Sequence, residues 1–172
     1  MMLHAPVSQA AFRNAMARVC APVNIITTNG PAGRGGFTAT AMCPVTDEPP
    51  TLLVCMNSRS AQTALFMENR RFCVNVLTGD HKDLAGFFAG REPDMASRFA
   101  AGDWVDFASG NQALADAIVS FDCLLKEARL VGTHNILIGE VVEIRARRDG
   151  HALLYVDRSF VNGPSLAMAL EQ

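Results

Sequence analysis

The amino-acid sequence predicts a mainly β fold with flanking helices, most simply a closed β-barrel with the helices outside it. About six or seven segments have the residue pattern of strands, and the helical segments between them are few and short. The strands do not alternate regularly with long helices, which argues against a doubly wound parallel sheet. The 172 residues contain no internal repeat and no linker, so we expect a single domain over residues 1–172.

The first half of the chain carries clear local signals. Ser8 is a suitable N-cap for an amphipathic helix, β-branched residues follow from Val23, and Asn29-Gly30-Pro31 marks a turn. A proline-rich bend at Asp47–Pro50 separates two further apolar segments. The elements expected from these signals are a helix over 8–18 and strands over 23–28, 37–43 and 51–56.

The second half is more plainly β. The expected elements are helices over 60–69 and 82–89, a loop over 90–96, and strands over 72–77, 117–131, 136–147 and 153–156. His134 is expected in a turn between two of these strands. Asp149-Gly150 predicts a hairpin, and residues 165–172 are expected to form a loose helical turn.

Composition excludes several classes of function. Lys plus Arg number 15 and Asp plus Glu 17, and the net charge of −2 gives no electrostatic footprint for nucleic acid. No apolar run approaches 18 residues and residues 1–9 do not resemble a signal peptide, so neither a membrane span nor secretion is expected. The five cysteines form no CxxC pair and are expected to be buried free thiols in a reducing cytoplasm; no metal site is expected.

The known short motifs do not explain the chain. Gly33-Arg34-Gly35-Gly36 resembles a dinucleotide-binding glycine loop, but Thr38 stands where the third glycine should be and a strand follows instead of a helix. A tight hairpin turn is the better interpretation. The sequence also contains no GxSxG, Walker or HExxH motif.

Two segments favour a flat, negatively charged ligand. Thr38, Ala39, Thr40 and Ala41 form a strand of small side chains, which is either an ordinary close-packed strand or a wall whose backbone and hydroxyls bond a planar ring. Asn57, Ser58, Arg59 and Ser60 connect a strand end to a helix start. They are either a plain helix cap or, with free N–H groups and a guanidinium, a phosphate site.

Three other residues are weaker candidates. A lone histidine such as His134 is more often structural than catalytic. Phe88 and Arg91 offer an aromatic ring and a charge at a helix end, but the ring is equally suited to packing in the core.

Taken together, these segments resemble the short-chain flavin reductases, an FMN-binding split-barrel family, and within it the pyrimidine-utilisation and 4-hydroxyphenylacetate 3-monooxygenase reductases. The resemblance covers most of the chain from Phe12 to about Phe160. The segments that carry it are FRNAMA (12–17), VNIITTNGPAGRGGFTATAMCPVTDEPPTLLVCMN (23–57), RRFCVNVL (70–77), SFDC (120–123) and VGTHNILIGEV (131–141).

The resemblance implies a homodimeric split β-barrel of Greek-key type, with a core over about 8–162 and flavin bound near the dimer interface. It implies reduction of FMN, or alternatively FAD, by NADH or alternatively NADPH, with reduced flavin diffusing to a partner flavin-dependent monooxygenase. Carried over by residue, Thr38, Ala39, Thr40 and Ala41 would line the ring edge, and Asn57, Ser58, Arg59 and Ser60 would hold the phosphate. His134 would contact the nicotinamide or flavin as the catalytic residue, with Phe88 and Arg91 flanking the cofactor.

Two alternatives remain open at this point. A barrel of this kind could carry electrons with flavin permanently bound, or it could bind a small molecule without redox work, as in flavin storage or haem handling. Weak, exchangeable flavin with steady NADH turnover would favour the enzyme, and an absence of NADH oxidation with added FMN would favour a binding protein.

Overall fold

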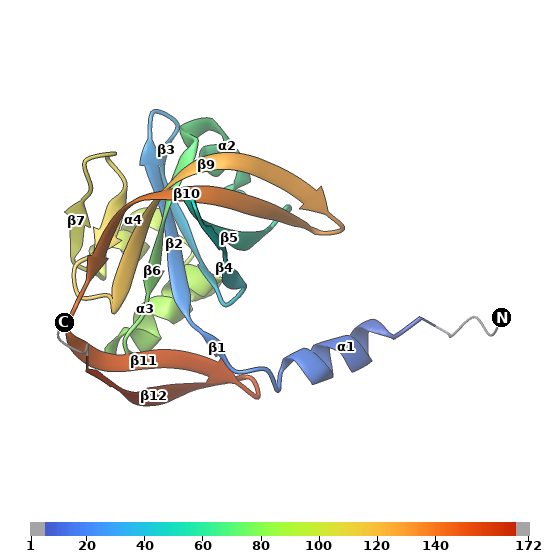
Figure 1. Cartoon of the computed structure of the whole chain (residues 1–172). Helices are drawn as coiled ribbons and strands as arrows, with labels where there is room; N and C mark the ends of the chain where they lie inside the picture. Colours follow the sequence, from blue (N-terminus) through green and yellow to red (C-terminus); the bar gives the residue numbers. More distant parts are fainter. Residues whose placement is uncertain (1–5, 168–172) are drawn as a thin grey trace.

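The computed structural model describes residues 6–167 and is mainly β with flanking helices (Figure 1). The helical elements are α1 (Gln9–Met16), α2 (Thr63–Asn69), the 3-10 turn η1 (Gly79–His81), α3 (Lys82–Gly86), the π-helix η2 (Phe87–Arg91) and α4 (Met95–Ala100). The strands are β1 (Ala21–Pro22), β2 (Asn24–Gly30), β3 (Gly33–Ala39), β4 (Met42–Asp47), β5 (Pro50–Asn57), β6 (Arg71–Val76), β7 (Trp104–Asp106), β8 (Gln112–Leu114), β9 (Val119–Val131), β10 (His134–Ala146), β11 (Asp149–Val156) and β12 (Ser159–Ala167).

Seven strands form the main sheet, in the order β3-β2-β6-β9-β10-β5-β4, with every neighbouring pair antiparallel. The long β9–β10 hairpin crosses the centre of the sheet in Figure 1. Its register shifts between Ile138 and Gly139 and again between Val141 and Glu143. Such shifts are β-bulges, at which one strand has an extra residue opposite its partner.

Two hydrophobic clusters lie on opposite faces of β2. Ile26 joins one cluster with Val54, Phe66 and Leu137, all fully buried. Ile25 joins the other, which is built mainly from α3, η2, α4 and β11. Because side chains alternate along a strand, β2 is buried on both faces, and its central residues Ile25–Thr28 are all β-branched.

Two smaller sheets complete the described chain. β11 lies between β1 and β12 at the bottom of Figure 1, and Thr78 bridges to Ala152 of β11. β7 and β8 form a separate antiparallel pair. Figure 1 shows α1 projecting from the body of the molecule, and none of its residues is buried.

Several sequence-based expectations are wrong in detail. The strand expected over 37–43 is broken, because the chain leaves the sheet at Thr40-Ala41 between β3 and β4. Asp149-Gly150 does not close a hairpin between β10 and β11, since β11 pairs instead with β1 and β12. In this part of the chain, the hairpin joins β11 to β12, and its turn lies at Asp157-Arg158, where both residues have positive φ.

Other differences concern the end and the middle of the chain. Residues 165–167 belong to β12 and not to a helical turn, and 168–172 lie outside the described residues. The expected loop over 90–96 contains the end of η2 and the start of α4, and β7 and β8 were not expected. No helix within residues 6–167 has the length and apolar character needed to span a bilayer.

Candidate functional site

A cavity of about 790 Å³ opens where β3 and β5 end and β10 begins. It is lined by residues 36–41, the end of β5 (Cys55–Asn57), Ser60 and Gln62 before α2, part of η2 (Phe88–Gly90), and His134 and Ile136 of β10. Phe12, Arg98 and Val131 complete the described lining. This volume lies in the range of small-molecule and cofactor sites.

The wall of the cavity is the small-residue segment Thr38–Ala41. Thr38 is held in place, because its hydroxyl donates to the Ala85 carbonyl of α3 at 2.7 Å. Among the described residues, no hydrogen bond uses the backbone N–H groups of Thr40 and Ala41, which lie beyond the end of β3. The break in the strand therefore leaves two backbone donors available beside the cavity.

The wall also depends on Gly36. A Cβ at Gly36 would lie 2.8 Å from the Phe88 ring and 3.0 Å from the Ile26 carbonyl oxygen. Phe88 is 2% exposed and packs edge-on against Phe99, with ring centroids 5.2 Å apart. Phe88 thus belongs to the core and also backs the cavity.

The segment from Asn57 to Ser60 forms a hydrogen-bonded turn before α2, whose N-cap is Gln62. The N–H of Ser58 donates to the Thr133 carbonyl, and those of Arg59 and Ser60 donate to Asn57. The Ser60 hydroxyl accepts from the N–H of Gln62 at 3.2 Å. Asn57 and Ser60 line the cavity, whereas Ser58 and Arg59 do not. The free N–H groups expected here are therefore already paired, and any anion would be held by side chains.

Strand pairing places His134 at the mouth of the same cavity. His134 begins β10 and is not in a turn, and it lies opposite Asn57 of β5 and Val131 of β9. Its Nδ1 lies 3.0 Å from the Thr133 hydroxyl oxygen. The exposed imidazole borders the cavity, so the ring can meet a ligand there.

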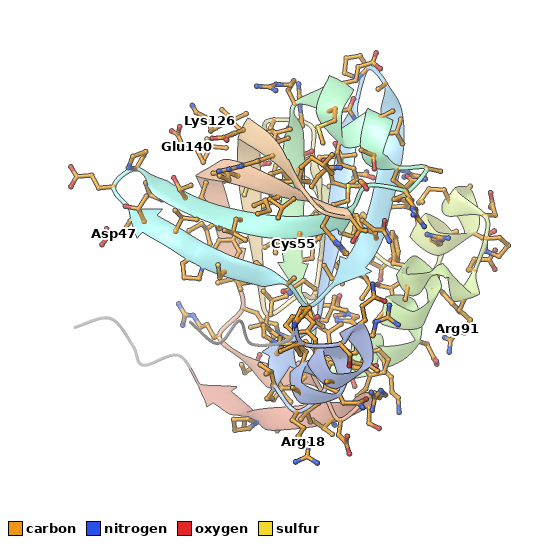
Figure 2. All side chains as sticks on the ribbon, turned by 90° about the vertical axis from the view of Figure 1, so that its right-hand side faces the viewer. Arg18, Asp47, Cys55, Arg91, Lys126 and Glu140 are labelled. Atoms are coloured by element: carbon orange, nitrogen blue, oxygen red, sulfur yellow. The ribbon has the colours of Figure 1, made fainter. Side chains whose placement is uncertain are left out.

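Arg91 lies away from the cavity lining. Its guanidinium pairs with the Asp83 carboxylate at 2.9 Å and covers the Phe87 ring. Figure 2 shows Arg91 directed outward at the edge of the molecule. The structure therefore brings together Thr38–Ala41, Asn57, Ser60, Phe88 and His134, but not Ser58, Arg59 and Arg91.

Sequence reasoning missed two polar lining residues, Gln62 and Arg98. The Gln62 Oε1 atom is buried and has no hydrogen-bond partner among the described residues. The atom lies against Gly35, where it would clash with a Cβ, so the Gln62 side chain would have to turn before this oxygen could meet a ligand in the cavity. Neither residue belongs to a motif, and only the fold places them at the cavity.

Cysteine chemistry offers no nucleophile at the cavity. Cys55 lies on β5 at the centre of Figure 2, and burial together with nearby Cys43 raises the pKa of its thiol. A protonated thiol is a poor nucleophile. Cys73 and Cys123 are buried as expected, but the expectation is wrong for Cys20 and Cys43, which are exposed. No cluster of three or more His, Cys, Asp or Glu side chains occurs within residues 6–167.

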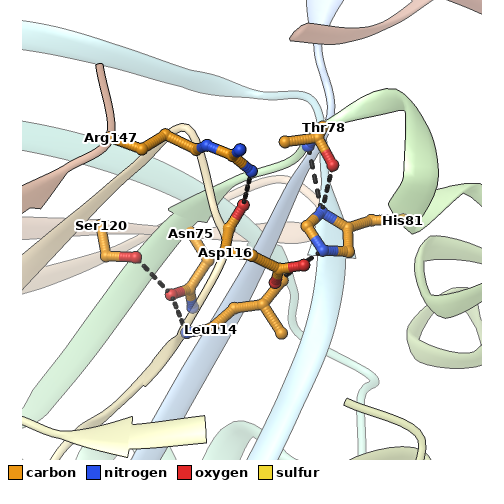
Figure 3. A network of polar contacts seen from close by, with 7 residues as sticks. All are labelled: Asn75, Thr78, His81, Leu114, Asp116, Ser120 and Arg147. Atoms are coloured by element: carbon orange, nitrogen blue, oxygen red, sulfur yellow. Dashed lines mark hydrogen bonds and ion pairs between the residues drawn. The ribbon is translucent and has the colours of Figure 1, made fainter. Parts of the chain in front are cut away.

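A second polar cluster has the composition of a catalytic triad but not its accessibility. His81 Nε2 lies 2.9 Å from the Asp116 carboxylate, and Nδ1 lies 3.0 Å from the Thr78 hydroxyl (Figure 3). Thr78 is 3% exposed, and its backbone N–H also donates to Nδ1. The cluster closes the β6–η1 corner as a capping box, so its role is structural.

Asn75 performs a similar structural role nearby. Its Oδ1 accepts from the Leu114 N–H and the Ser120 hydroxyl, both at 2.8 Å, and joins β8 and β9 to β6 (Figure 3). Neither polar cluster therefore competes with the large cavity as a candidate ligand site.

Comparison with known proteins agrees with this geometry. A family model described as "Flavin reductase like domain" matches residues 16–164. The curated "FMN reductase (NADH) RutF" of Pantoea ananatis (strain LMG 20103) is 49% identical over 156 residues, which cover 91% of this chain and 82% of the relative.

Solved structures give the same result. The crystal structure of ycdh from Haemophilus somnus 129PT has a TM-score of 0.87 and 40% identity, covering 91% of this chain and 99% of that chain. BorF, the flavin reductase component of a bacterial two-component tryptophan halogenase, has a TM-score of 0.82 and 27% identity, covering 91% and 99%. The present chain therefore belongs to the flavin reductase like domain family.

Proposed function

We propose that this protein reduces free FMN, or alternatively FAD, at the expense of NADH, or alternatively NADPH, and releases the reduced flavin to a partner flavin-dependent monooxygenase. The relative named as an NADH-dependent FMN reductase and the halogenase reductase BorF support this activity. The observation that carries the proposal is the cavity whose wall, Thr38–Ala41, consists of small side chains beside unpaired backbone donors.

The described residues fit a flavin at this cavity. The flavin, when bound, supplies the redox chemistry by accepting electrons from the reduced nicotinamide. Thr38–Ala41 lie against the ring, and the N–H groups of Thr40 and Ala41 donate to its polar edge. Gln62 also lines the cavity, and its amide would reach the ligand once the side chain turns away from Gly35.

The phosphate is held at the Asn57–Ser60 segment. Asn57 and Ser60 line the cavity, whereas the exposed Arg59 lies outside the lining and would turn toward the phosphate to reach it. Ser58 anchors the segment, because both its N–H and its hydroxyl donate to the Thr133 carbonyl. The anchor keeps the phosphate residues next to His134.

Arg59→Ala is expected to weaken FMN binding by about tenfold, or about 1.5 kcal/mol, through loss of a charge-assisted hydrogen bond. The value lies at the low end of the usual range because Arg59 is exposed to solvent. Riboflavin lacks the phosphate and should bind the wild type and the variant equally in fluorescence titrations. An equal loss for riboflavin would show that Arg59 acts elsewhere.

His134 is the residue that positions the nicotinamide. It lies beside Asn57 at the cavity mouth, and its exposed ring is accessible to an incoming second substrate. We expect His134→Ala to raise the KM for NADH about tenfold while FMN affinity changes by less than about threefold. His151→Ala, an exposed histidine of β11 outside the cavity lining, is the matched control. Comparable damage to NADH and FMN binding would contradict this role.

Quaternary structure and barrel closure form a further part of the proposal. A closed split β-barrel of Greek-key type in a single domain is supported by the approach of β3 to β5 and by the structural neighbours.

A homodimer is supported by apolar side chains left exposed on α1 and the β9–β10 tip, where Phe12 is 60% and Leu130 63% exposed. Sedimentation equilibrium should give twice the 18.5 kDa chain mass. The five free cysteines suit a cytoplasmic enzyme.

Anaerobic stopped-flow mixing of the protein with NADH or NADPH and with FMN or FAD tests the proposed function. NADH oxidation that depends on added FMN, together with weak and exchangeable flavin binding, is the expected result. Absence of oxidation with every pair of substrates would contradict the proposal. A permanently bound flavin that is reduced without turnover of free flavin would indicate an electron carrier instead.

A further inference from the structure

Arg98 is the one described lining residue of the large cavity that carries a full charge at neutral pH. It lies on α4, is partly buried, and donates from Nε to the Glu92 carbonyl. No other side-chain hydrogen bond of Arg98 occurs among the described residues. The two Nη groups of the guanidinium are therefore available at the cavity.

Local structure holds Arg98 in this position. Gly90, inside η2, has φ of +106°, and beyond the end of η2 the Glu92 carbonyl accepts from Arg98 of α4. Asp94 caps α4 by accepting from the Ser97 N–H at 2.8 Å and from the Ser97 hydroxyl at 2.7 Å. The neighbouring Phe99 is 2% exposed and packs against Phe88 and Trp104. The helix is thus anchored on one side while Arg98 borders the cavity on the other.

Nearby arginines already have other partners. Arg34 stacks on the Phe99 ring, with Cζ 4.2 Å from the ring centroid, and donates to Gln112 at 3.2 Å. Arg91 pairs with Asp83. Neither residue lines the cavity, so Arg98 supplies the fixed positive charge of the described cavity lining.

A cation placed in a partly buried site favours negative charge on the ligand that meets it. Under the proposed function, the flavin phosphate is assigned to Asn57–Ser60, which leaves the ring as the part of the flavin that can meet Arg98. The ring becomes negative on reduction, at the N1–C2=O part of its pyrimidine edge. Electrostatic stabilisation is most effective where charge develops during the reaction.

We propose that Arg98 faces the pyrimidine edge of the flavin ring, fixes which way round the ring lies against Thr38–Ala41, and stabilises the reduced form. The inference rests on the proposed function, because it requires a flavin in this cavity. It assigns to Arg98 a preference for reduced over oxidised flavin, separate from the phosphate contact assigned to Arg59.

The test compares the binding of oxidised and reduced FMN under anaerobic conditions, at a pH where free reduced FMN is anionic. Arg98→Gln removes the charge, Arg98→Lys keeps it, and Arg148→Gln removes an exposed arginine outside the cavity lining. Riboflavin is titrated in parallel, and thermal unfolding checks that each variant is folded.

In Arg98→Gln we expect affinity for reduced FMN to fall about tenfold while affinity for oxidised FMN changes less than about threefold. A tenfold difference between the two forms lowers the two-electron potential of bound FMN by about 30 mV. Riboflavin should follow FMN, Arg98→Lys should restore most of the preference, and Arg148→Gln should match the wild type.

Equal losses of affinity for oxidised and reduced FMN would overturn the inference. A loss of affinity for FMN but not for riboflavin would also overturn it, because it would place Arg98 at the phosphate. An unchanged ratio in a folded Arg98→Gln variant would also overturn it while leaving the proposed function intact. If the wild type neither binds FMN nor oxidises NADH, the proposed function fails and this inference fails with it.

Discussion

Replacing Thr40 with tryptophan is expected to weaken FMN binding by at least about 100-fold, which corresponds to about 2.7 kcal/mol. Thr40 lies beyond the end of β3, is partly buried and lines the cavity. An indole at this position would occupy the space that the small-residue wall leaves for the flavin ring. Titration of flavin fluorescence measures the loss directly.

Thr40→Val is the matched control, because it keeps the shape of the side chain and removes only the hydroxyl. Its cost should not exceed about tenfold, the value of one neutral hydrogen bond. Thr40 forms no side-chain hydrogen bond among the described residues and lies outside the sheets, so neither change should greatly alter the unfolding temperature. If Thr40→Trp bound FMN as the wild type does, the ring would have to lie elsewhere.

The strands of the main sheet could be predicted from the sequence because their signals are local. The segment expected over 51–56 is β5 (Pro50–Asn57), and the one expected over 117–131 is β9 (Val119–Val131). Alternation identified β10 but not its buried face. The core takes Leu137, which is fully buried, while Ile144 is 56% exposed. Three consecutive apolar residues, Ile136-Leu137-Ile138, do not show which face of the strand is buried.

Between β6 and β9, the helix expected over 82–89 corresponds to α3 and the start of η2, but α4, β7 and β8 could not be predicted from local signals. The Trp104 indole N–H donates to the Phe99 carbonyl at 2.8 Å, and the Thr27 hydroxyl donates to the Gln112 carbonyl at 2.7 Å. Short elements held by such contacts have no strong periodicity of their own. Tertiary contacts therefore determine the secondary structure of this region.

The residues of the candidate site could be predicted where they lie at strand ends. They could not be predicted where tertiary packing alone brings them to the cavity. Small residues marked the wall at Thr38–Ala41, and the family pattern pointed to His134. The pairing of His134 with Asn57 and the approach of Arg98 to the cavity arise only from the fold. The paired N–H groups at Asn57–Ser60 show why a cap signal alone does not predict an anion site.

Phe88 connects the stability of the fold to the shape of the site. Its ring is 2% exposed and lies between the Gly36 wall and the Phe99 and Trp104 rings, with centroids 5.2 and 5.8 Å away. Phe88→Ala is expected to lower the free energy of unfolding by about 3–5 kcal/mol, because it removes a buried aromatic ring and leaves a cavity. Urea unfolding of the ligand-free protein measures this loss.

Phe87→Ala is the control, because Phe87 is the preceding residue of η2, is only partly buried and is covered by Arg91. Its loss should be clearly smaller than that of Phe88→Ala. Phe88→Leu keeps most of the apolar volume and should recover much of the stability. A similar loss in the two alanine variants would mean that Phe88 does not anchor η2. In that case the wall at Gly36 and the position of α4, which carries Arg98, would have to depend on contacts other than the Phe88–Phe99–Trp104 cluster.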